Sequence, residues 1–255
     1  MIRCLLIFNF GFFAICVYAQ HISISDSVYK HNPEWAKVTN ERELVHHLAY
    51  TLEYNESCEQ ASWVAYILTR EKSSGTIERS DHFRSDPMVL SGSADKTDYY
   101  KSGFDRGHLA PAADMKWSEQ AMDESFYFSN MSPQKPAFNR GIWKKLEEKV
   151  RDWALQYDSL LVVTGPILDS SLSLIGPNEV CIPAYFYKAV VVYRGEKSKA
   201  IAFILPNKAS SLPLSDFVIS IDELEARAQL DFFYGLSDSL EVKIESQYCV
   251  TCWDW

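Results

Sequence analysis

Two nearby segments carry the residue types needed to hydrolyse a phosphodiester. His108 stands in the run Asp105-Arg106-Gly107-His108-Leu109-Ala110-Pro111, and Asn139 stands in the run Phe138-Asn139-Arg140-Gly141-Ile142-Trp143. An imidazole with its ordinary pKa of about 6.5 is mostly neutral near pH 7, so it can take a proton from water. An amide oxygen suits Mg²⁺, which keeps most of its waters and often takes only one or two protein ligands. The pair predicts metal-assisted cleavage of a phosphodiester bond.

Groups beside this pair are candidates for supporting roles. Asp105 and Arg106 could orient the imidazole and hold phosphate, and Gly107 suggests a tight turn that exposes the ring. Glu147, two helical turns beyond Asn139, could bind a water of the metal. Plainer interpretations stay open: a hydrogen-bonded structural histidine, Asn139 as a helix N-cap, and a surface pair of Glu147 with Arg151. Local sequence does not decide whether Asn130 is a structural amide or an active-site donor.

The elements that must position these groups can be predicted from periodicity. Residues 139–157 carry apolar side chains at helical spacing, and Ser220-Ile221-Asp222-Glu223 predicts the start of a second helix that ends near Phe233. Short runs of aromatic and β-branched residues predict strands, and residues 72–103 predict a long surface loop. The expected strands are residues 50–55, 62–70, 125–130, 160–164, 180–194 and 200–205. The expected class is α+β, with a mixed central sheet and helices packed beside it.

The N-terminal residues resemble a secretory signal. Met1–Ala19 has one early positive residue, Arg3, and then an apolar run, so we expect cleavage before Gln20 and export to the periplasm or the extracellular space. Lipidation at Cys16 is the alternative, although Ile15 is bulkier than the residue that usually precedes a lipidated cysteine. We expect residues 20–38 to form an N-terminal arm and residues 39–255 to form one domain. No later stretch is apolar enough to predict a transmembrane segment.

Charge and cysteine content limit the function classes. The net charge of −9 argues against coating of nucleic acid by a global positive field, yet residues 134–151 hold six basic and two acidic residues. This segment could form a phosphate-binding face. Beyond the signal stand Cys58, Cys181, Cys249 and Cys252, and an even count in an exported chain favours disulfides, with three pairings open. Zinc at the Cys249/Cys252 pair, or a redox-active pair, is the alternative.

Taken together, these motifs resemble the DNA/RNA non-specific endonuclease family of ββα-metal nucleases. The resemblance covers most of the chain after the signal. Besides the two runs quoted above, it rests on these segments in this order: Trp63-Val64-Ala65-Tyr66, Ala112-Ala113-Asp114-Met115, Phe128-Ser129-Asn130-Met131-Ser132-Pro133-Gln134, Leu146-Glu147, Val163-Thr164-Gly165-Pro166, Ile182-Pro183 and Phe186-Tyr187-Lys188.

The resemblance implies an antiparallel central sheet with a ββα-metal motif, and it implies roles for single residues. His108 would be the general base, Asn139 the protein ligand of Mg²⁺, and Glu147 a partner of metal-bound water. Arg106, Asn130 and Arg151 match positions associated with phosphate or active-site support. Arg70 matches, more loosely, an arginine that follows an early strand.

The activity implied by this resemblance is cleavage of DNA and RNA, without base preference, to 5′-phosphate ends. Mg²⁺ is the expected cofactor, with Mn²⁺ as a substitute. Partners would be DNA and RNA contacted through the backbone, with a homodimer and an inhibitor protein left open. Two alternatives remain: an exported phosphodiesterase for small diesters, and a catalytically silent module that binds extracellular DNA. The Trp253-Asp254-Trp255 end lies outside the motifs, and core packing or partner docking could explain it.

Overall fold

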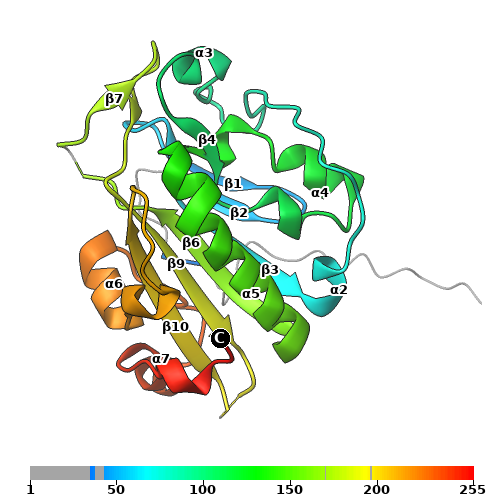
Figure 1. Ribbon diagram of the computed structural model, residues 1–255, viewed down its shortest axis with the longest axis vertical. Coiled ribbons are helices and arrows are strands. Elements are labelled where there is room, and N and C mark those ends of the chain that lie inside the picture. Colours follow the sequence, from blue (N-terminus) through cyan, green and yellow to red (C-terminus); the bar gives the residue numbers. More distant parts are fainter. Residues whose placement is uncertain (1–34, 38–42, 170, 196) are drawn as a thin grey trace, which may run out of the picture. The chain divides into compact units, whose positions relative to one another are not determined.

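A seven-stranded antiparallel sheet forms the centre of the fold, in the order β1-β2-β3-β6-β9-β10-β11 (Figure 1). The computed structural model describes residues 35–37, 43–169, 171–195 and 197–255, so the predicted signal segment and most of the predicted arm lie outside the described residues. The strands of this sheet are β1 (Glu43–His46), β2 (Thr51–Asn55), β3 (Gln60–Thr69), β6 (Ser159–Pro166), β9 (Tyr185–Val192), β10 (Lys199–Pro206) and β11 (Val218–Ile219). The predicted α+β class is confirmed.

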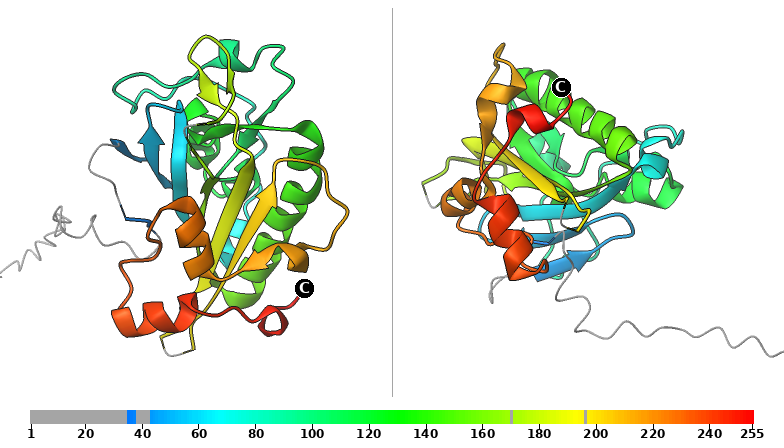
Figure 2. Two further views of the ribbon diagram at one scale, coloured as in Figure 1. Left: turned by 90° about the vertical axis from the view of Figure 1, so that its left-hand side faces the viewer. Right: turned by 90° about the horizontal axis from the view of Figure 1, so that it is seen from below.

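Both faces of the sheet are buried, and residues alternate between two hydrophobic cores as the strand period of two requires. In β9, Phe186 and Val190 belong to one core, whereas Tyr187 and Val191 belong to the other. Helix α5 (Lys144–Tyr157) covers the first face, and α6 (Ile221–Ala228) and α7 (Asp238–Glu245) lie on the second (Figure 2). The molecule is therefore built in layers, with helices on both sides of the sheet.

The clearest periodicity in the sequence does form a helix. Leu146, Val150, Trp153 and Ala154 of α5 are buried against the sheet, which confirms the amphipathic prediction. The N-terminal part of the predicted helix differs, because residues Phe138–Trp143 form a separate π-type turn, η3, and Gly141 inside it has non-helical backbone angles. Single π-type turns often occur at functional sites. Asn139 therefore lies on an irregular turn and is not the N-cap of α5.

The remaining elements are short. They are α2 (Arg70–Ser73), α3 (Lys96–Tyr99), α4 (Glu119–Glu124), the strands β4 (Asp105–His108), β5 (Met131–Gln134), β7 (Leu174–Ile175) and β8 (Val180–Cys181), and the single turns η1 (Ala112–Asp114), η2 (Phe128–Asn130), η4 (Leu214–Phe217) and η5 (Val250–Cys252). Helix α6 begins as predicted, since the Ser220 side chain accepts a hydrogen bond from the backbone N–H of Glu223. It ends at Ala228, several residues before the predicted end near Phe233.

Two strand predictions were wrong in detail. Residues 125–130 are not a strand, because the chain leaves α4 there and forms the turn η2 before β5 begins at Met131. Residues 180–194 are not one strand either, because the chain between β8 and β9 includes Pro183, which has no N–H to donate to a ladder. The predicted loop over residues 72–103 is confirmed, apart from the end of α2 and the single turn α3.

The two ends of the described chain pack on opposite faces of the sheet. Trp35 and Ala36, inside the predicted arm, are buried in the core beneath α6, and Ala36 bridges to Phe232. Trp253 is buried against Trp153 of α5, with ring centroids 4.5 Å apart, so the aromatic C-terminal run closes a core. Among the helices that the structure describes, none is long and apolar enough to cross a membrane.

Disulfides account for all four cysteines beyond the predicted signal. Cys58 pairs with Cys181 across 123 positions of sequence, and Cys249 pairs with Cys252. These two bonds select one of the three pairings that the sequence left open and remove the thiolates that a zinc site at Cys249 and Cys252 would need. The first bond joins the β2–β3 turn to β8, close to the segment that supports the candidate site.

Candidate active site

The motif that carries the site is a two-stranded ladder followed by a helix. Strand β4 pairs with β5 in antiparallel register, with Asp105 opposite Gln134 and His108 opposite Met131, and the chain then passes through η3 into α5. Gly107 lets the two strands approach because it has no Cβ. A Cβ there would lie 2.2 Å from the Gln134 side chain. The predicted tight turn at Gly107 is therefore wrong, and close packing explains this glycine.

Asparagine side chains hold this motif to the body of the protein. Asn207 accepts a hydrogen bond from the backbone N–H of Lys135 and donates to the carbonyls of Pro133 and Pro183. Asn130 is fully buried, and its amide bonds to the backbone of Ala110 and Ser125. The structure thus uses Asn130 to support the loop after β4 and does not turn it toward substrate. Sequence reasoning missed Asn207, which gives no local signal.

The orientation of Asn139 suits a metal ligand. Its Nδ2 donates to Oδ2 of Asp105 at 2.9 Å, and because only the NH₂ group can donate to a carboxylate, its Oδ1 points away. That oxygen accepts no hydrogen bond from the described residues. Asp105 is itself held by two hydrogen bonds from Arg140, at 2.8 and 2.6 Å, and so does not orient His108 as predicted. Burial acts to raise the pKa of Asp105, but the bonds from Arg140 and Asn139 outweigh it and keep that pKa low.

His108 lies among aromatic rings. The edge contact with Phe126 has centroids 4.9 Å apart, and Phe83 lies at 5.8 Å. The Nε2 atom is buried and has no hydrogen-bond partner among the described residues. Burial, together with the positive charges of Arg79 and Arg106, lowers the pKa of His108 to about 3. The ring is therefore neutral at physiological pH, which is the state a proton acceptor needs.

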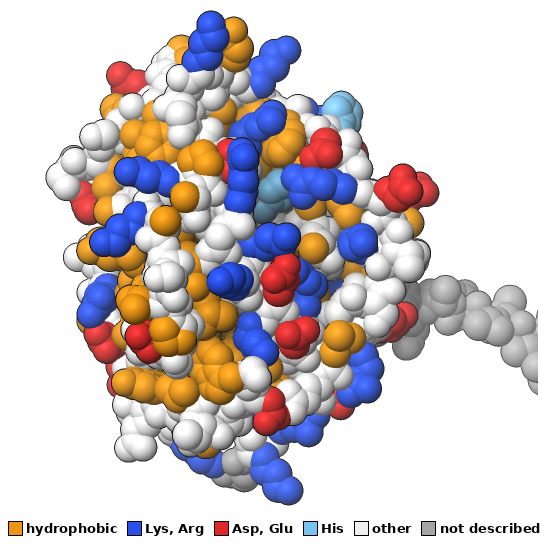
Figure 3. All heavy atoms as spheres, viewed as in Figure 1, with side chains coloured by type: hydrophobic (Ala, Val, Ile, Leu, Met, Phe, Trp, Pro, Cys, Tyr) orange, Lys and Arg blue, Asp and Glu red, His pale blue; other side chains and the backbone are white. Residues whose placement is uncertain are grey.

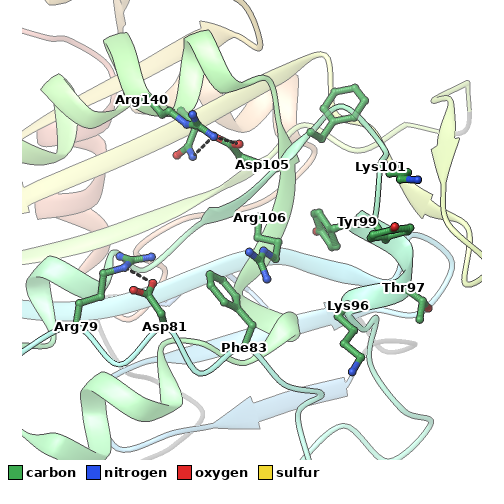
Figure 4. Close-up of a pocket in the computed structure, with 13 residues that line it drawn as sticks. Arg79, Asp81, Phe83, Lys96, Thr97, Tyr99, Lys101, Asp105, Arg106 and Arg140 are labelled. Atoms are coloured by element: carbon green, nitrogen blue, oxygen red, sulfur yellow. Dashed lines mark hydrogen bonds and ion pairs between the residues drawn. The ribbon is translucent and has the colours of Figure 1, made fainter.

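A basic and aromatic pocket of about 700 Å³ opens beside these residues (Figure 4). It is lined by Arg79, Asp81, Phe83, Lys96, Thr97, Tyr99, Tyr100, Lys101, Phe104, Asp105, Arg106, Asn139 and Arg140. The Arg106 guanidinium lies 3.8 Å from the centre of the Phe83 ring, and Phe83 in turn contacts His108. His108 does not line the pocket directly. Figure 3 shows the same face of the molecule, where Lys and Arg side chains gather in a band.

Arg79 is the arginine that the sequence interpretation missed. It lines the pocket and lies over the Phe126 ring at 4.7 Å, whereas the predicted Arg70 binds Asp158 at 2.7 Å. Asp158 caps the C-terminal end of α5, and the 14 residues of that helix span about 21 Å from the end near Asn139. The structure therefore does not bring Arg70 to the site.

Behind the site, α5 presents a buried charged cluster. Arg151 donates to Asp114 at 2.9 Å, and Tyr66 donates to the other oxygen of the same carboxylate. Burial raises the pKa of Glu147 and lowers that of Lys188, the buried lysine that faces it from β9. Arg151 has an internal partner and does not line the pocket. The predicted surface pair of Glu147 with Arg151 is replaced by this cluster of five residues.

The chain is similar to known proteins in sequence and in fold. The model of the DNA/RNA non-specific endonuclease family matches residues 30–239. The chain belongs to this family. It is 36% identical over 231 residues to nuclease C1 of Cunninghamella echinulata var. echinulata, covering 83% of this chain and 90% of that one. Human mitochondrial endonuclease G is 34% identical over 199 residues, covering 72% and 67%.

Other relatives extend beyond the matched region. The mitochondrial nuclease EXOG of Danio rerio is 35% identical over 204 residues, which are 73% of this chain but only 60% of the relative. In structure, the chain resembles a crystal structure of the EndoG/EndoGI complex, with a TM-score of 0.72 and 30% identity over 79% of this chain and 89% of that chain. The family likeness therefore extends from sequence to fold.

Proposed function

We propose that this protein is a metal-dependent endonuclease that hydrolyses DNA and RNA without base preference, leaving 5′-phosphate ends. The observation that carries the proposal is that one β4–β5–η3 motif presents two suitable groups. Asn139 presents a free amide oxygen, and His108 presents a neutral ring with a buried, unpartnered nitrogen. Family membership supports the same reaction class.

The chain's own groups divide the work of hydrolysis. His108 accepts the proton of the attacking water, and Arg79 and Arg106 place positive charge where the phosphorane-like transition state becomes negative. Asn139 would hold Mg²⁺, or Mn²⁺ in its place, with Glu147 hydrogen-bonded to the water around it. A divalent cation bound there supplies charge that stabilises the leaving 3′-oxygen.

A bound phosphodiester changes the environment of the base. In the free protein, the charges of Arg79 and Arg106 help to keep the pKa of His108 low. The phosphate is an anion, so its binding between these guanidinium groups offsets their repulsion of the imidazolium and raises that pKa. His108 thus becomes a stronger base when substrate is present.

The pocket supports a nucleic acid better than a small diester. Lys96 and Lys101 are exposed at its rim and can pair with further phosphates, and Tyr100 is 71% exposed, so a base can stack on its ring. Such contacts read no base edge, which accounts for cleavage without sequence preference. A small diester would leave these groups unused. Export, a homodimer and an inhibitor protein remain predictions from the sequence.

Plasmid nicking tests the proposal directly. We expect the purified chain from Gln20 onward to nick supercoiled plasmid and to cut single-stranded RNA with Mg²⁺, and EDTA to stop both. His108→Ala should lower kcat by about 10²–10⁴-fold because the general base is lost. Asn139→Ala should weaken the dependence of rate on Mg²⁺ and lower kcat as well.

The matched control is His82→Ala. His82 is an exposed histidine hydrogen-bonded to Asp123, and it does not line the pocket. This variant should cut at the wild-type rate. DNA binding without cutting by the wild type would favour the silent binding module, and cleavage of a small chromogenic diester without plasmid nicking would favour the phosphodiesterase.

A further inference from the structure

A second cluster of acidic side chains lies on the face of the sheet opposite α5. Helices α6 and α7 pack side by side there (Figure 2). A cavity of about 400 Å³ is lined by residues of both helices. Asp222, Asp231, Glu241 and Glu245 line it together with Lys37. Nothing in the proposed nuclease mechanism uses these groups.

Three carboxylates in this region converge on one point. Asp222 and Glu225 come from α6, Glu245 is the last residue of α7, and one oxygen from each lies within 4.8 Å of the others. Oxygens that share one Ca²⁺ at 2.3–2.6 Å cannot lie farther apart than about 5 Å. Each pair of these oxygens is therefore close enough to share one ion.

Glu245 is the informative member of the cluster. This residue is only 6% exposed, and its Oε1 is buried and has no hydrogen-bond partner among the described residues. A buried, unpartnered carboxylate oxygen is unfavourable because the oxygen has lost its water and gained nothing in exchange. The lysine at the cavity does not supply the missing partner, since Lys37 binds Asp231 at 3.4 Å.

Acidic neighbours dominate the electrostatics of the cluster. Burial, followed by the charges of Glu225, Glu241, Asp222 and Asp231, raises the pKa of Glu245 to about 9. Burial, Asp231, Asp222 and Glu241 raise the pKa of Glu225 to about 7, although a hydrogen bond from the Phe232 backbone N–H opposes them. A divalent cation at this point would remove the repulsion.

We propose that Asp222, Glu225 and Glu245 form a Ca²⁺ site that fastens α7 to α6, separate from the catalytic centre. Ca²⁺ fits better than Mg²⁺ because it accepts irregular sets of six to eight oxygens, whereas Mg²⁺ demands near-ideal octahedral geometry. Three carboxylates leave positions for water, which the cavity can supply. Glu245 lies beyond the family match, which ends at residue 239, so the site joins a family helix to a segment outside that match.

The test measures Ca²⁺ binding and thermal stability of the full chain in the Asn139→Ala background, which removes the proposed metal ligand of the active site. Sites of extracellular modules bind Ca²⁺ with Kd of about 10⁻⁴–10⁻³ M. Titration calorimetry should therefore detect one Ca²⁺ per chain in that range. At about 10 mM Ca²⁺, which is about 10–100 times that Kd, Tm should rise by several degrees.

Two variants locate the effect. Glu245→Gln and Asp222→Asn should abolish both the binding and the rise in Tm, because each removes a carboxylate ligand. Asp222 is exposed, so its variant folds even where a change at buried Glu245 does not. The control is Glu223→Gln, on the same helix but paired with Arg227, and it should respond to Ca²⁺ like the parent.

Three results would overturn the proposal. An unchanged Tm in Ca²⁺ would mean that the carboxylates are accommodated by binding protons. A wild-type response in both Glu245→Gln and Asp222→Asn would place the ion elsewhere. An equal rise in Tm with Mg²⁺ at the same concentration would contradict the assignment to Ca²⁺.

Discussion

The two faces of the central sheet carry opposite charge, and each shifts the pKa of a buried group accordingly. On the α5 face, Arg79 and Arg106 help to lower the pKa of His108. On the α6 and α7 face, Glu225 and its acidic neighbours help to raise the pKa of Glu245. Burial is the largest cause in both cases, and it favours the neutral form of the histidine and of the carboxyl group alike.

This difference shows why the net charge of −9 does not determine which partner the protein binds. The central sheet lies between the two sets of groups, and exposed charges farther apart than about 8 Å are largely screened at physiological ionic strength. Each face therefore presents its own field. The pocket lining holds five basic and two acidic residues, so the acidic excess of the chain belongs to regions away from the pocket.

The two arginines that follow β3 should differ strongly in their effect on catalysis. Arg79→Ala should lower kcat by about 10²-fold, as the loss of one donor to a developing anion commonly does. Arg70→Ala should leave kcat unchanged, because Arg70 binds Asp158 at the other end of α5. Steady-state cleavage of a fluorescent oligonucleotide measures both. A larger loss for Arg70→Ala would restore the sequence-based prediction.

The contrast between these arginines shows where prediction from sequence ends. Helix α5 was predictable because its apolar residues follow one helical face, and the strands β3, β6 and β10 were predictable because they are rich in buried β-branched and aromatic residues. Arg79 was not, because it stands in a loop whose path depends on contacts distant in sequence. Its guanidinium pairs with Asp81 at 2.6 Å and lies over the ring of Phe126, which is 47 positions away in the sequence.

Errors at the site itself have the same physical origin. Phe126 and Phe128 alternate as in a strand, yet they bury their rings in two separate small cores on either side of Phe83. A short apolar run in the sequence does not reveal whether it will pair in a sheet or lie in a loop. His108 and Asn139 were recognisable in the sequence as chemical groups. The partners of Asp105 were not, because the turn η3 is what brings Asn139 and Arg140 to that carboxylate.

A smaller effect should appear in the salt dependence of binding. Lys96 and Lys101 line the pocket, and a lysine that contacts one phosphate of duplex DNA contributes about 0.9 to the slope of log affinity against log salt concentration. Lys96→Gln and Lys101→Gln should each reduce that slope by about this amount for uncleaved DNA in EDTA, measured by fluorescence anisotropy. The double variant should lose twice as much.

The matched control for this prediction is on the other face. Lys37 is also exposed, but it lies beside Asp231 at the α6 and α7 cavity. Lys37→Gln should leave the salt slope unchanged although it makes the net charge more negative by the same amount. An equal decrease in slope for all three variants would mean that DNA responds to the total charge and that the two faces do not act separately.

The smallest expected effect is a displacement of the acid limb of the pH–rate profile. Neutral His108 is the active form, so its low pKa in the free protein keeps kcat/KM high to well below the ordinary histidine pKa of about 6.5. Removing a nearby cation lets the imidazolium form more easily and raises that pKa. Arg106→Gln should therefore move the acid limb of kcat/KM to higher pH, and the shift is read from profiles normalised to their plateaus.

The acid limb of kcat reports the enzyme–substrate complex. In the wild type it should lie at higher pH than the limb of kcat/KM, because bound phosphate already offsets the charge of Arg106. For the same reason the variant should shift kcat less than kcat/KM. Equal shifts in both would show that substrate phosphate does not approach this guanidinium, and Arg106 would then act on His108 only through Phe83.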